Sequence, residues 1–512
     1  MALTHRILKN LGAMFTGRAI SIIQQLIVPP VFIARYGTAR FGEWGVLSGA
    51  IAALSILNFG VQTYMNQDLA VRWNRGETDG YHLRQSSALR LLSAVILAAA
   101  ILCLGIFVLP LDTLLRLDIS RHAAQLTLYL LALQVLLNIL FGYFAGIFMG
   151  IALAHRGAHW NNAQSFIASI SILIAIAFHA SFPVLAATQL ASLLICTVGV
   201  LIDIRRTEPR IFPTIRHWDR ATAISILKPS GYFGLIAITT FLVYQAPLLI
   251  LQRIVGPVAV AGFILMRTIF SMCRQVLAIF TQSMGAEITN LFGRQDWPLL
   301  TRLYLFSERF IFFLISVVNV TVLMLSPVLI TLWLHKKAVP GHPSPHINSL
   351  FAITPYVLAS AISMVISLKE HKLQFQFSTN THVQLARLMF FSYIAMVAIS
   401  GGTIHFAGVT GFLWTWLAFE LLQTGRLIQL NVRLFAHVQK LESTYVLRLF
   451  AVCTVSLGLA VLTLQRTMGL PLLWQTAIAA LAGLLVAAVT WPLFHVREVA
   501  SVLLARFGKR FA

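Results

Sequence analysis

Long apolar runs separated by short polar breaks make up most of this chain. A helix that crosses a bilayer core needs about 20 consecutive apolar residues. Runs near that length lie at residues 11–36, 42–65, 88–110, 123–150, 161–180, 184–202, 229–252, 258–284, 307–334, 347–368, 386–406, 409–432, 445–466 and 471–492. The pattern therefore predicts an all-α polytopic membrane protein with about fourteen transmembrane helices.

The distribution of positive charge gives these predicted helices an orientation. The 512 residues include 38 Lys+Arg and 16 Asp+Glu, which leaves a net charge of +22. With the N-terminus inside, 26 of the basic residues fall in cytoplasmic segments or at the span ends next to them, eight in outer loops or at the adjoining span ends, and four deeper within spans. Because Lys and Arg collect on the cytoplasmic side of membrane proteins, both termini are predicted to be cytoplasmic.

Composition and motifs argue against several classes of function. A pI near 10.7 is common in nucleic-acid-binding proteins. This chain is 58% hydrophobic and 11% charged, so it lacks the solvated surface for a basic footprint, and no nucleic-acid partner is expected. The four cysteines stand in apolar runs without metal-binding spacing, which argues against a disulfide scaffold or zinc site. Because no nucleotide-binding or common hydrolase motif occurs, we expect no enzymatic activity, metal or cofactor.

A basic segment divides the predicted helices into two sets of six and a final pair. Prolines lie at similar places in the first helix of each set, at Pro29–Pro30 and at Pro247. Such matching interruptions are typical of transporters built from repeats, although membrane helices in general carry extra Pro and Gly. We predict a first lobe over residues 1–204, a cytoplasmic linker over 205–228, a second lobe over 229–436, and two further spans with a basic cytoplasmic tail over 437–512.

Two arginines within the predicted eighth span are the first candidates for a site. Arg267 and Arg274 are seven residues apart, so both should lie on one helix face, about 10 Å apart along the axis, with Ser271 between them. A charge inside the bilayer is costly unless it faces a polar cavity, and Arg binds phosphate in a bidentate geometry. We predict an anion site here. The alternatives are that each side chain extends to the membrane surface or pairs with a carboxylate of a neighbouring helix.

The first two spans carry polar residues at helical spacing. Arg18, Ser21 and Gln25 form a stripe on the first span, where Arg18 is a further candidate for the anion or extends to the membrane surface. On the second span Ser48, Ser55 and Gln62 recur every seven residues, with Asn58 close by. The amides of Gln25, Asn58 and Gln62 are candidates for binding sugar hydroxyls. Alternatively, these groups hydrogen-bond between helices.

The twelfth span contains Glu420, Gln423 and Arg426 on one broad face. An intramembrane Glu is a candidate carrier of a proton or sodium ion, so Glu420 and Arg426 are predicted coupling residues. The alternative is a structural Glu–Arg pair with a neighbouring helix.

Short motifs in the first two spans resemble those of a known family. They are Lys9-Asn10, Pro29-Pro30, Ala34-Arg35-Tyr36-Gly37, the run from Phe41 to Leu47, and Leu57-Asn58-Phe59-Gly60. Together they resemble the polysaccharide exporters of the multidrug/oligosaccharidyl-lipid/polysaccharide flippase superfamily, which also contains multidrug and toxin extrusion pumps and lipid II flippases. Those exporters usually have Asp where Asn58 stands, so a charge-based role at that position is not expected.

The resemblance implies two six-helix lobes, related by a pseudo-two-fold axis, around a cationic cavity. Relatives carry cavity arginines on spans one and eight, where Arg18 and Arg267 stand, and Arg274 adds a further cation. The implied substrate is an oligosaccharide on undecaprenyl pyrophosphate, an O-antigen or exopolysaccharide unit. It would be flipped across the bacterial inner membrane by alternating access, with membrane lipids, a polysaccharide polymerase and chain-length machinery as partners.

Two other functions remain open at this stage. A cation-coupled multidrug exporter would share the architecture but would favour acidic cavity residues. A membrane-embedded polysaccharide polymerase or ligase would need a sizeable outer loop, whereas the longest predicted ones, near 111–122 and 335–347, are short.

Overall fold

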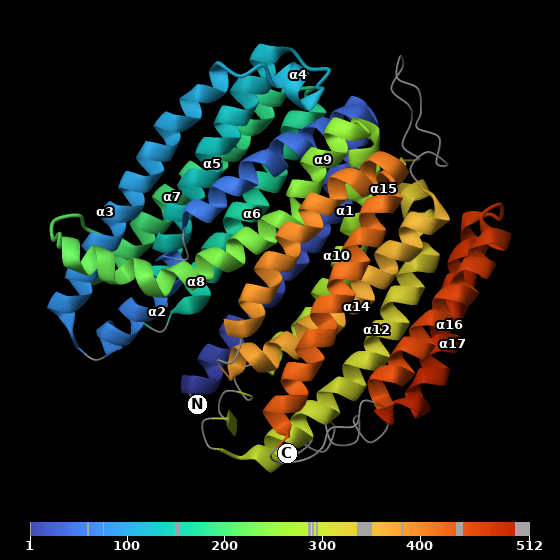
Figure 1. Cartoon of the computed structure of the whole chain (residues 1–512). Helices are drawn as coiled ribbons and strands as arrows, with labels where there is room; N and C mark the ends of the chain where they lie inside the picture. Colours follow the sequence, from blue (N-terminus) through green and yellow to red (C-terminus); the bar gives the residue numbers. More distant parts are fainter. Residues whose placement is uncertain are drawn as a thin grey trace. The chain divides into compact units, whose positions relative to one another are not determined.

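The computed structural model describes residues 2–58, 61–74, 76–148, 151, 153–284, 288, 291–292, 295–334, 351–379, 383–436 and 444–496. All regular secondary structure in these ranges is helical (Figure 1). The helices are α1 (Ala2–Ala52), α2 (Val61–Asn74), α3 (Thr78–Leu102), α4 (Leu111–Leu115), α5 (Arg121–Ile147), α6 (Ala154–Ala177), α7 (Phe182–Thr207), α8 (Arg220–Tyr244), α9 (Ala246–Ile254), α10 (Pro257–Ser283), α12 (Trp297–Leu334), α14 (Ile353–Ser378), α15 (Val383–Phe435), α16 (Thr444–Thr467) and α17 (Leu472–Leu493).

The lengths and apolar composition of these helices confirm a multi-pass membrane protein. Among the described residues, eleven helices are long and apolar enough to cross a membrane, and a shorter apolar helix covers Ile238–Ile254. Two of the eleven are interrupted: α1 leaves helical geometry at Gly37, with φ of 83°, and α15 at Ala407 and Gly408. Each of these long helices therefore contains two of the predicted spans, and every predicted range overlaps a helical segment.

Several predicted boundaries differ from the observed ones by up to about ten residues, and two of these differences involve residues discussed below. The second span was expected to run from 42 to 65, but α1 ends at Ala52 and a 3-10 turn over Ala53–Asn58 precedes α2. The tenth was expected to end at residue 368, whereas α14 continues to Ser378. Lys369 and Lys372 follow the predicted tenth span and were therefore included in the 26 cytoplasmic basic residues. Both are instead buried within α14, with 4% and 0% of their surface exposed. At the tenth span, polar residues end the apolar run without ending the helix. At the second span the opposite holds, because the α-helix ends at Ala52 while the apolar run continues.

The chain divides into two compact units, with the boundary inside α10 between Ala261 and Gly262. In the first unit α5 packs on α7, α1 on α6, and α2 and α3 on α8. Close helix contacts here depend on glycine: a Cβ on Gly157 of α6 would lie 2.1 Å from the carbonyl oxygen of Ala145 in α5.

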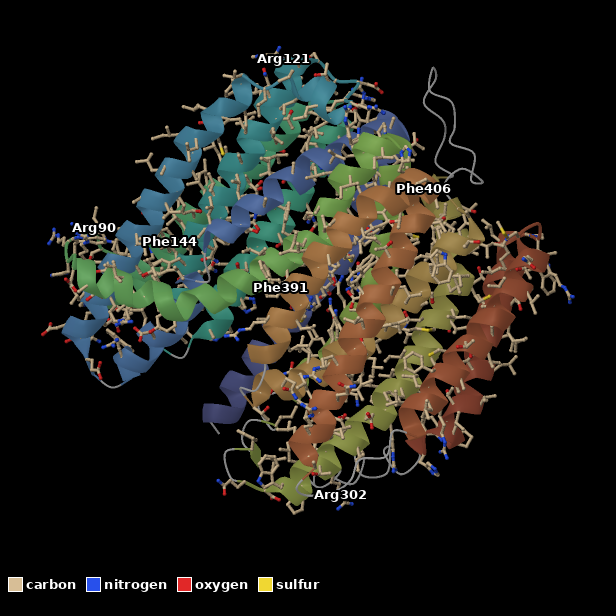
Figure 2. The ribbon with its side chains drawn as sticks, in the orientation of Figure 1. Arg90, Arg121, Phe144, Arg302, Phe391 and Phe406 are labelled. Atoms are coloured by element: carbon tan, nitrogen blue, oxygen red, sulfur yellow. The ribbon has the colours of Figure 1, made fainter. Side chains whose placement is uncertain are left out.

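In the second unit α14 packs against both α12 and α15, and α12 also contacts α16 and α17. Aromatic rings of Tyr304, Phe375 and Phe435 fill one end of this core. Apolar side chains also cover the outer surfaces of the bundle. Phe391 and Phe406, labelled in Figure 2, are 66% and 88% exposed, as expected for side chains that face lipid.

Residues of the motif that begins at Phe41 pack tightly against neighbouring segments of the first unit. A Cβ on Gly42 would lie 2.0 Å from the carbonyl oxygen of Pro257, so only glycine fits there. The fully buried Glu43 carboxylate accepts hydrogen bonds from Arg40, at 3.1 Å, and from the backbone N–H of Asp118. These residues of the motif therefore hold helices and a connecting segment together.

Candidate functional site

The predicted anion-binding arginines line one small cavity in the second unit. Arg267 and Arg274 both reach it from α10, while Ser363 of α14 and Trp416 of α15 contribute to the opposite walls. Ser363 also donates a hydrogen bond to the Phe270 carbonyl of α10, at 3.4 Å. The seven-residue spacing therefore brings the two arginines to a common surface. Ser271, by contrast, donates to the Thr268 carbonyl within its own helix, at 2.8 Å.

Aromatic rings form much of the cavity wall beside Arg267. The guanidinium carbon of Arg267 lies 5.8 Å from the ring centroid of Phe263, within cation–π range. Phe263 packs edge-on against Phe412, and Phe412 packs against Trp416. The low dielectric of such surroundings strengthens the attraction between the arginine and an anion.

The volume of the cavity limits what it can hold in this conformation. At about 20 Å³ it has room for about one water molecule and not for a pyrophosphate group. An anion of that size could bind only after α10 moves away from α14 or α15.

A carboxylate also lies on the α14 face that lines this cavity. Glu370 follows Ile366 by four residues and Ser363 by seven, and both of those side chains line the cavity. Helical periodicity therefore places the half-buried Glu370 on the same face, one turn further along. Glu370 is the natural candidate for the arginine–carboxylate pairing described above as an alternative to an anion site.

Behind the cavity, Glu420 belongs to a fully buried polar network. Its carboxylate forms an ion pair with Lys369 of α14 and accepts hydrogen bonds from the Tyr393 hydroxyl, at 2.7 Å, and the Trp416 indole N–H, at 3.0 Å. Lys369 also donates to Gln423, at 3.1 Å. Because Trp416 both lines the cavity and donates to Glu420, it connects the two.

A second lysine–glutamate pair lies three residues further along α14. The Lys372 ammonium contacts the Glu308 carboxylate of α12 and donates to the Tyr304 hydroxyl, at 2.6 Å. His371 is hydrogen-bonded to Ser307, at 2.9 Å. Sequence reasoning missed this network because Lys369 and Lys372 follow the apolar run that defined the tenth span. An i, i+3 pair of lysines next to that run was the available signal.

Gln423 and Arg426, predicted to share a face with Glu420, have different environments. The Gln423 amide joins the Lys369 network and donates to Ser392, at 2.6 Å. Arg426 is half-buried and donates to Gln429 on its own helix, at 3.0 Å. The buried carboxylate is therefore paired with a lysine of a neighbouring helix and not with an arginine.

Arg18, Ser21 and Gln25 lie on α1 in the first unit. The Gln25 side chain donates to the Ser21 hydroxyl, at 3.0 Å. Arg18 is half-buried and makes no hydrogen bond or ion pair to any described residue. Its guanidinium is thus available to a ligand or to the membrane surface.

The amides expected to bind sugar are used largely in helix packing. The Asn58 side chain accepts from the backbone N–H of Gln62, at 3.0 Å, and donates to the Gln62 side chain, at 3.2 Å. It therefore caps the start of α2, which explains why a polar residue occupies this place. The Gln62 amide lies directly against Gly142 of α5, where a Cβ would be 2.2 Å away. Ser55 donates to the Ala52 carbonyl, at 2.7 Å, while Ser48 is half-buried.

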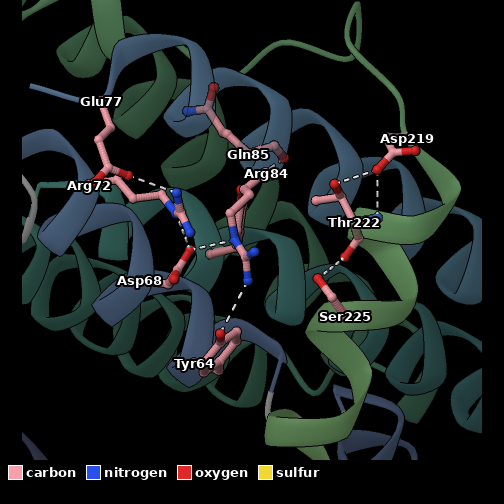
Figure 3. A network of polar contacts seen from close by, with 10 residues as sticks. Tyr64, Asp68, Arg72, Glu77, Arg84, Gln85, Asp219, Thr222 and Ser225 are labelled. Carbon is pink, nitrogen blue, oxygen red and sulfur yellow. Dashed lines mark hydrogen bonds and ion pairs between the residues drawn. The ribbon is translucent and has the colours of Figure 1, made fainter.

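The basic segment between α7 and α8 is held against α3 by specific contacts. Gln85 donates to the Ile211 carbonyl, at 2.9 Å, and Arg90 to that of Ile215, at 2.6 Å. Asp219 caps α8, and its pKa is lowered because the hydroxyl and backbone N–H of Thr222 donate to the carboxylate. Nearby, Asp68 accepts a hydrogen bond from Arg72 and forms an ion pair with Arg84 (Figure 3). The backbone of this segment is therefore fixed against α3, whereas the side chains of Arg205, Arg206, Arg216 and Arg220 are exposed.

Metal-ligating side chains do not gather in the part of the chain that the structure describes. No group of three or more His, Cys, Asp or Glu side chains suitable for a metal ion occurs there. Cys103, Cys196, Cys273 and Cys453 are free thiols. The outer segment 335–347 lies outside the described residues.

Comparison with known proteins identifies the fold. No family model and no curated protein sequence matches this chain. Among solved structures, an inward-facing multidrug resistance transporter of the MATE family and MOP superfamily is similar, with 13% identity, a TM-score of 0.67, and coverage of 82% of this chain and 96% of its own. The lipid II flippase MurJ in an inward closed conformation has 12% identity and a TM-score of 0.69, covering 96% of this chain and 100% of its own.

A third solved structure, the MATE transporter VcmN of Vibrio cholerae, has 13% identity and a TM-score of 0.56, covering 84% of this chain and 97% of its own. At these identities the similarity shows the fold. The chain has the fold of MOP-superfamily transporters, which confirms at that level the resemblance found in the sequence. The polysaccharide-exporter branch stays a prediction.

Proposed function

We propose that this chain is a flippase for an oligosaccharide linked to polyprenyl pyrophosphate. It would move an O-antigen or exopolysaccharide unit from the cytoplasmic to the periplasmic leaflet of a bacterial inner membrane. One observation carries the proposal: Arg267 and Arg274 line a single cavity in a chain with the fold of a lipid II flippase. A polysaccharide polymerase and its chain-length machinery would then receive the product.

The chemistry of the headgroup supports an arginine-lined path. Moving a pyrophosphate through hydrocarbon removes water from at least two negative charges, which is prohibitive without compensation. Two guanidinium groups supply charge-assisted, bidentate hydrogen bonds in place of water. The polyprenyl chain can stay in the bilayer while only the polar headgroup passes the arginines.

Alternating access is the mechanism that suits a closed cavity. In the present conformation the space between the arginines and Trp416 is too small for the headgroup. Binding therefore requires the helices around it to separate, so the site would be open in one state and closed in another. Because the sequence contains no nucleotide-binding motif, an ion gradient or the membrane potential would supply the energy. Glu420 and Arg426 stay the candidate coupling residues, and because Lys369 already pairs with the Glu420 carboxylate, Glu420 would act by gaining and losing a proton.

A cation-coupled multidrug exporter is the main alternative. It would present carboxylates to a cationic drug, yet among the described residues of the second unit the two buried carboxylates, Glu308 and Glu420, are each paired with a lysine. Arginines on the cavity wall favour an anionic substrate. A membrane-embedded polymerase or ligase has no comparable supporting observation.

A complementation assay tests whether Arg267 and Arg274 bind the anionic headgroup during transport. In a strain that lacks the chromosomal copy, the double variant Arg267→Ala/Arg274→Ala should lose most surface polysaccharide at unchanged protein abundance. Arg302→Ala is the matched control, because Arg302 is an exposed arginine of the same unit (Figure 2). Undiminished polysaccharide in the double variant would contradict the proposal. Sensitivity to cationic drugs in the deletion strain, with normal polysaccharide, would favour the multidrug exporter.

A further inference from the structure

The Lys369 ammonium is held by oxygen atoms from three side chains. It contacts the Glu420 carboxylate, the Tyr393 hydroxyl at 2.7 Å and the Gln423 amide oxygen at 3.1 Å. An ammonium group has three hydrogen-bond donors, so these oxygens satisfy all of them. The surrounding side chains are buried, with 4% of Lys369, 3% of Tyr393 and none of Glu420 or Gln423 exposed.

Other hydrogen bonds fix the orientation of these oxygens. Tyr393 and Trp416 both donate hydrogen bonds to Oε1 of the Glu420 carboxylate, so the other oxygen, Oε2, is directed at Lys369. The Gln423 amide donates to Ser392, at 2.6 Å, so its oxygen is turned toward the ammonium. The oxygens therefore form a preorganised cage with one negative charge, which is the environment that a hard monovalent cation prefers.

We propose that Lys369 is a resident cation, which occupies a site in the second unit that would otherwise bind Na⁺. The tethered ammonium neutralises Glu420 and satisfies its oxygens, so the wild-type protein does not take up a free cation there. Shortening the side chain would vacate space for Na⁺ and water while leaving the three oxygen ligands in place.

The neighbouring lysine provides a matched contrast. Lys372 is equally buried and paired with Glu308, but its one further oxygen contact among the described side chains is the Tyr304 hydroxyl, and two aromatic rings lie beside its ammonium. Its ammonium lies 4.3 Å from the Tyr304 ring centroid and 5.7 Å from that of Phe312. Removing Lys372 would therefore leave a carboxylate with too few oxygen ligands around it to hold Na⁺.

Thermal unfolding of the purified full-length protein in lipid nanodiscs tests the proposal. Melting temperatures are compared in NaCl, KCl and choline chloride at equal ionic strength, for the wild type, Lys369→Ala, Lys372→Ala and Lys369→Ala/Glu420→Gln. Because the readout is stability, its outcome is separate from that of the proposed transport activity.

The wild type should melt at the same temperature in all three salts. Lys369→Ala should melt lower in choline and rise by roughly 3–8 °C with saturable dependence on Na⁺. Lys372→Ala should be destabilised equally in all salts, and Glu420→Gln should abolish the Na⁺ response of Lys369→Ala.

Two results would overturn the proposal. The first is a folded Lys369→Ala protein that melts identically in the three salts. The second is a saturable rise of the wild-type melting temperature with Na⁺. If Lys369→Ala is too unstable to purify in choline, its yield of monodisperse protein after extraction in NaCl decides: recovery in NaCl alone supports a vacated cation site, and aggregation in both salts contradicts it.

Discussion

Replacing Glu308 with glutamine should destabilise the second unit strongly, because it leaves the Lys372 ammonium buried without a counter-charge. Lys372 has no exposed surface and Glu308 only 4%. Removing one partner of a buried ion pair costs about 3–5 kcal/mol. At 1.36 kcal/mol per factor of ten, this shifts the unfolding equilibrium by roughly 160- to 4,700-fold. The Tyr304 hydroxyl, at 2.6 Å from the ammonium, offsets only part of the loss.

The pairing itself is measured by a double-mutant cycle. Lys372→Met should cost about as much as Glu308→Gln, whereas the uncharged double variant Glu308→Gln/Lys372→Met should be more stable than either, since no uncompensated charge remains. Stability is followed by reversible unfolding in mixed micelles with increasing SDS, using tryptophan fluorescence. The exposed pair Arg210–Glu208 is the control, and its removal should have no measurable effect. If the losses of unfolding free energy in the two single variants of Glu308 and Lys372 simply add up in the double variant, the reasoning is refuted.

Two smaller predictions concern the first unit and its packing. Gly157→Ala should destabilise the protein by about 1–3 kcal/mol, because the new Cβ would meet the Ala145 carbonyl oxygen at 2.1 Å, and thermal unfolding should show this loss. Gly458→Ala in α16, where nothing lies within 4 Å, should be neutral or slightly stabilising, and a comparable loss there would contradict the packing explanation. Asp219→Ala should lower the melting temperature near neutral pH. The folded-state pKa of Asp219 is below 3.8, so protonation at acidic pH removes the stabilisation that the carboxylate provides. The difference in melting temperature between the wild type and Asp219→Ala should therefore shrink as the pH falls below about 3.8, and a difference that does not change with pH would contradict the capping role.

Features that depend on local sequence could be predicted well. The apolar runs gave the helices, because span length follows directly from bilayer thickness. The common surface of Arg267 and Arg274 followed from helical periodicity and needs no knowledge of neighbouring helices. The break at Gly37 was also visible, since a φ of 83° favours glycine.

Pairings between distant helices could not be predicted in the same way. Lys369 and Lys372 were predicted to lie in a loop because the hydropathy falls at the first charged residue. Their partners are distant in the sequence: Glu420 on α15 is 51 residues from Lys369, and Glu308 on α12 is 64 residues from Lys372. A buried charge is tolerated only when such a partner is present, and one sequence does not reveal which helices meet. Asn58 and Gln62, which were predicted to bind sugar, also cap and pack α2, and their role as sugar ligands stays a prediction.

Flipping by the purified protein tests the central claim most directly. The full chain is reconstituted in vesicles that contain a labelled polyprenyl-pyrophosphate oligosaccharide, and a membrane-impermeant reagent reports how fast the headgroup changes leaflet. The account predicts transfer well above that in empty vesicles, slowed at least about tenfold in Arg267→Ala/Arg274→Ala, because two charge-assisted contacts to the headgroup are lost. Transfer at the wild-type rate in that variant, or none above the empty-vesicle rate with the wild type, would contradict it.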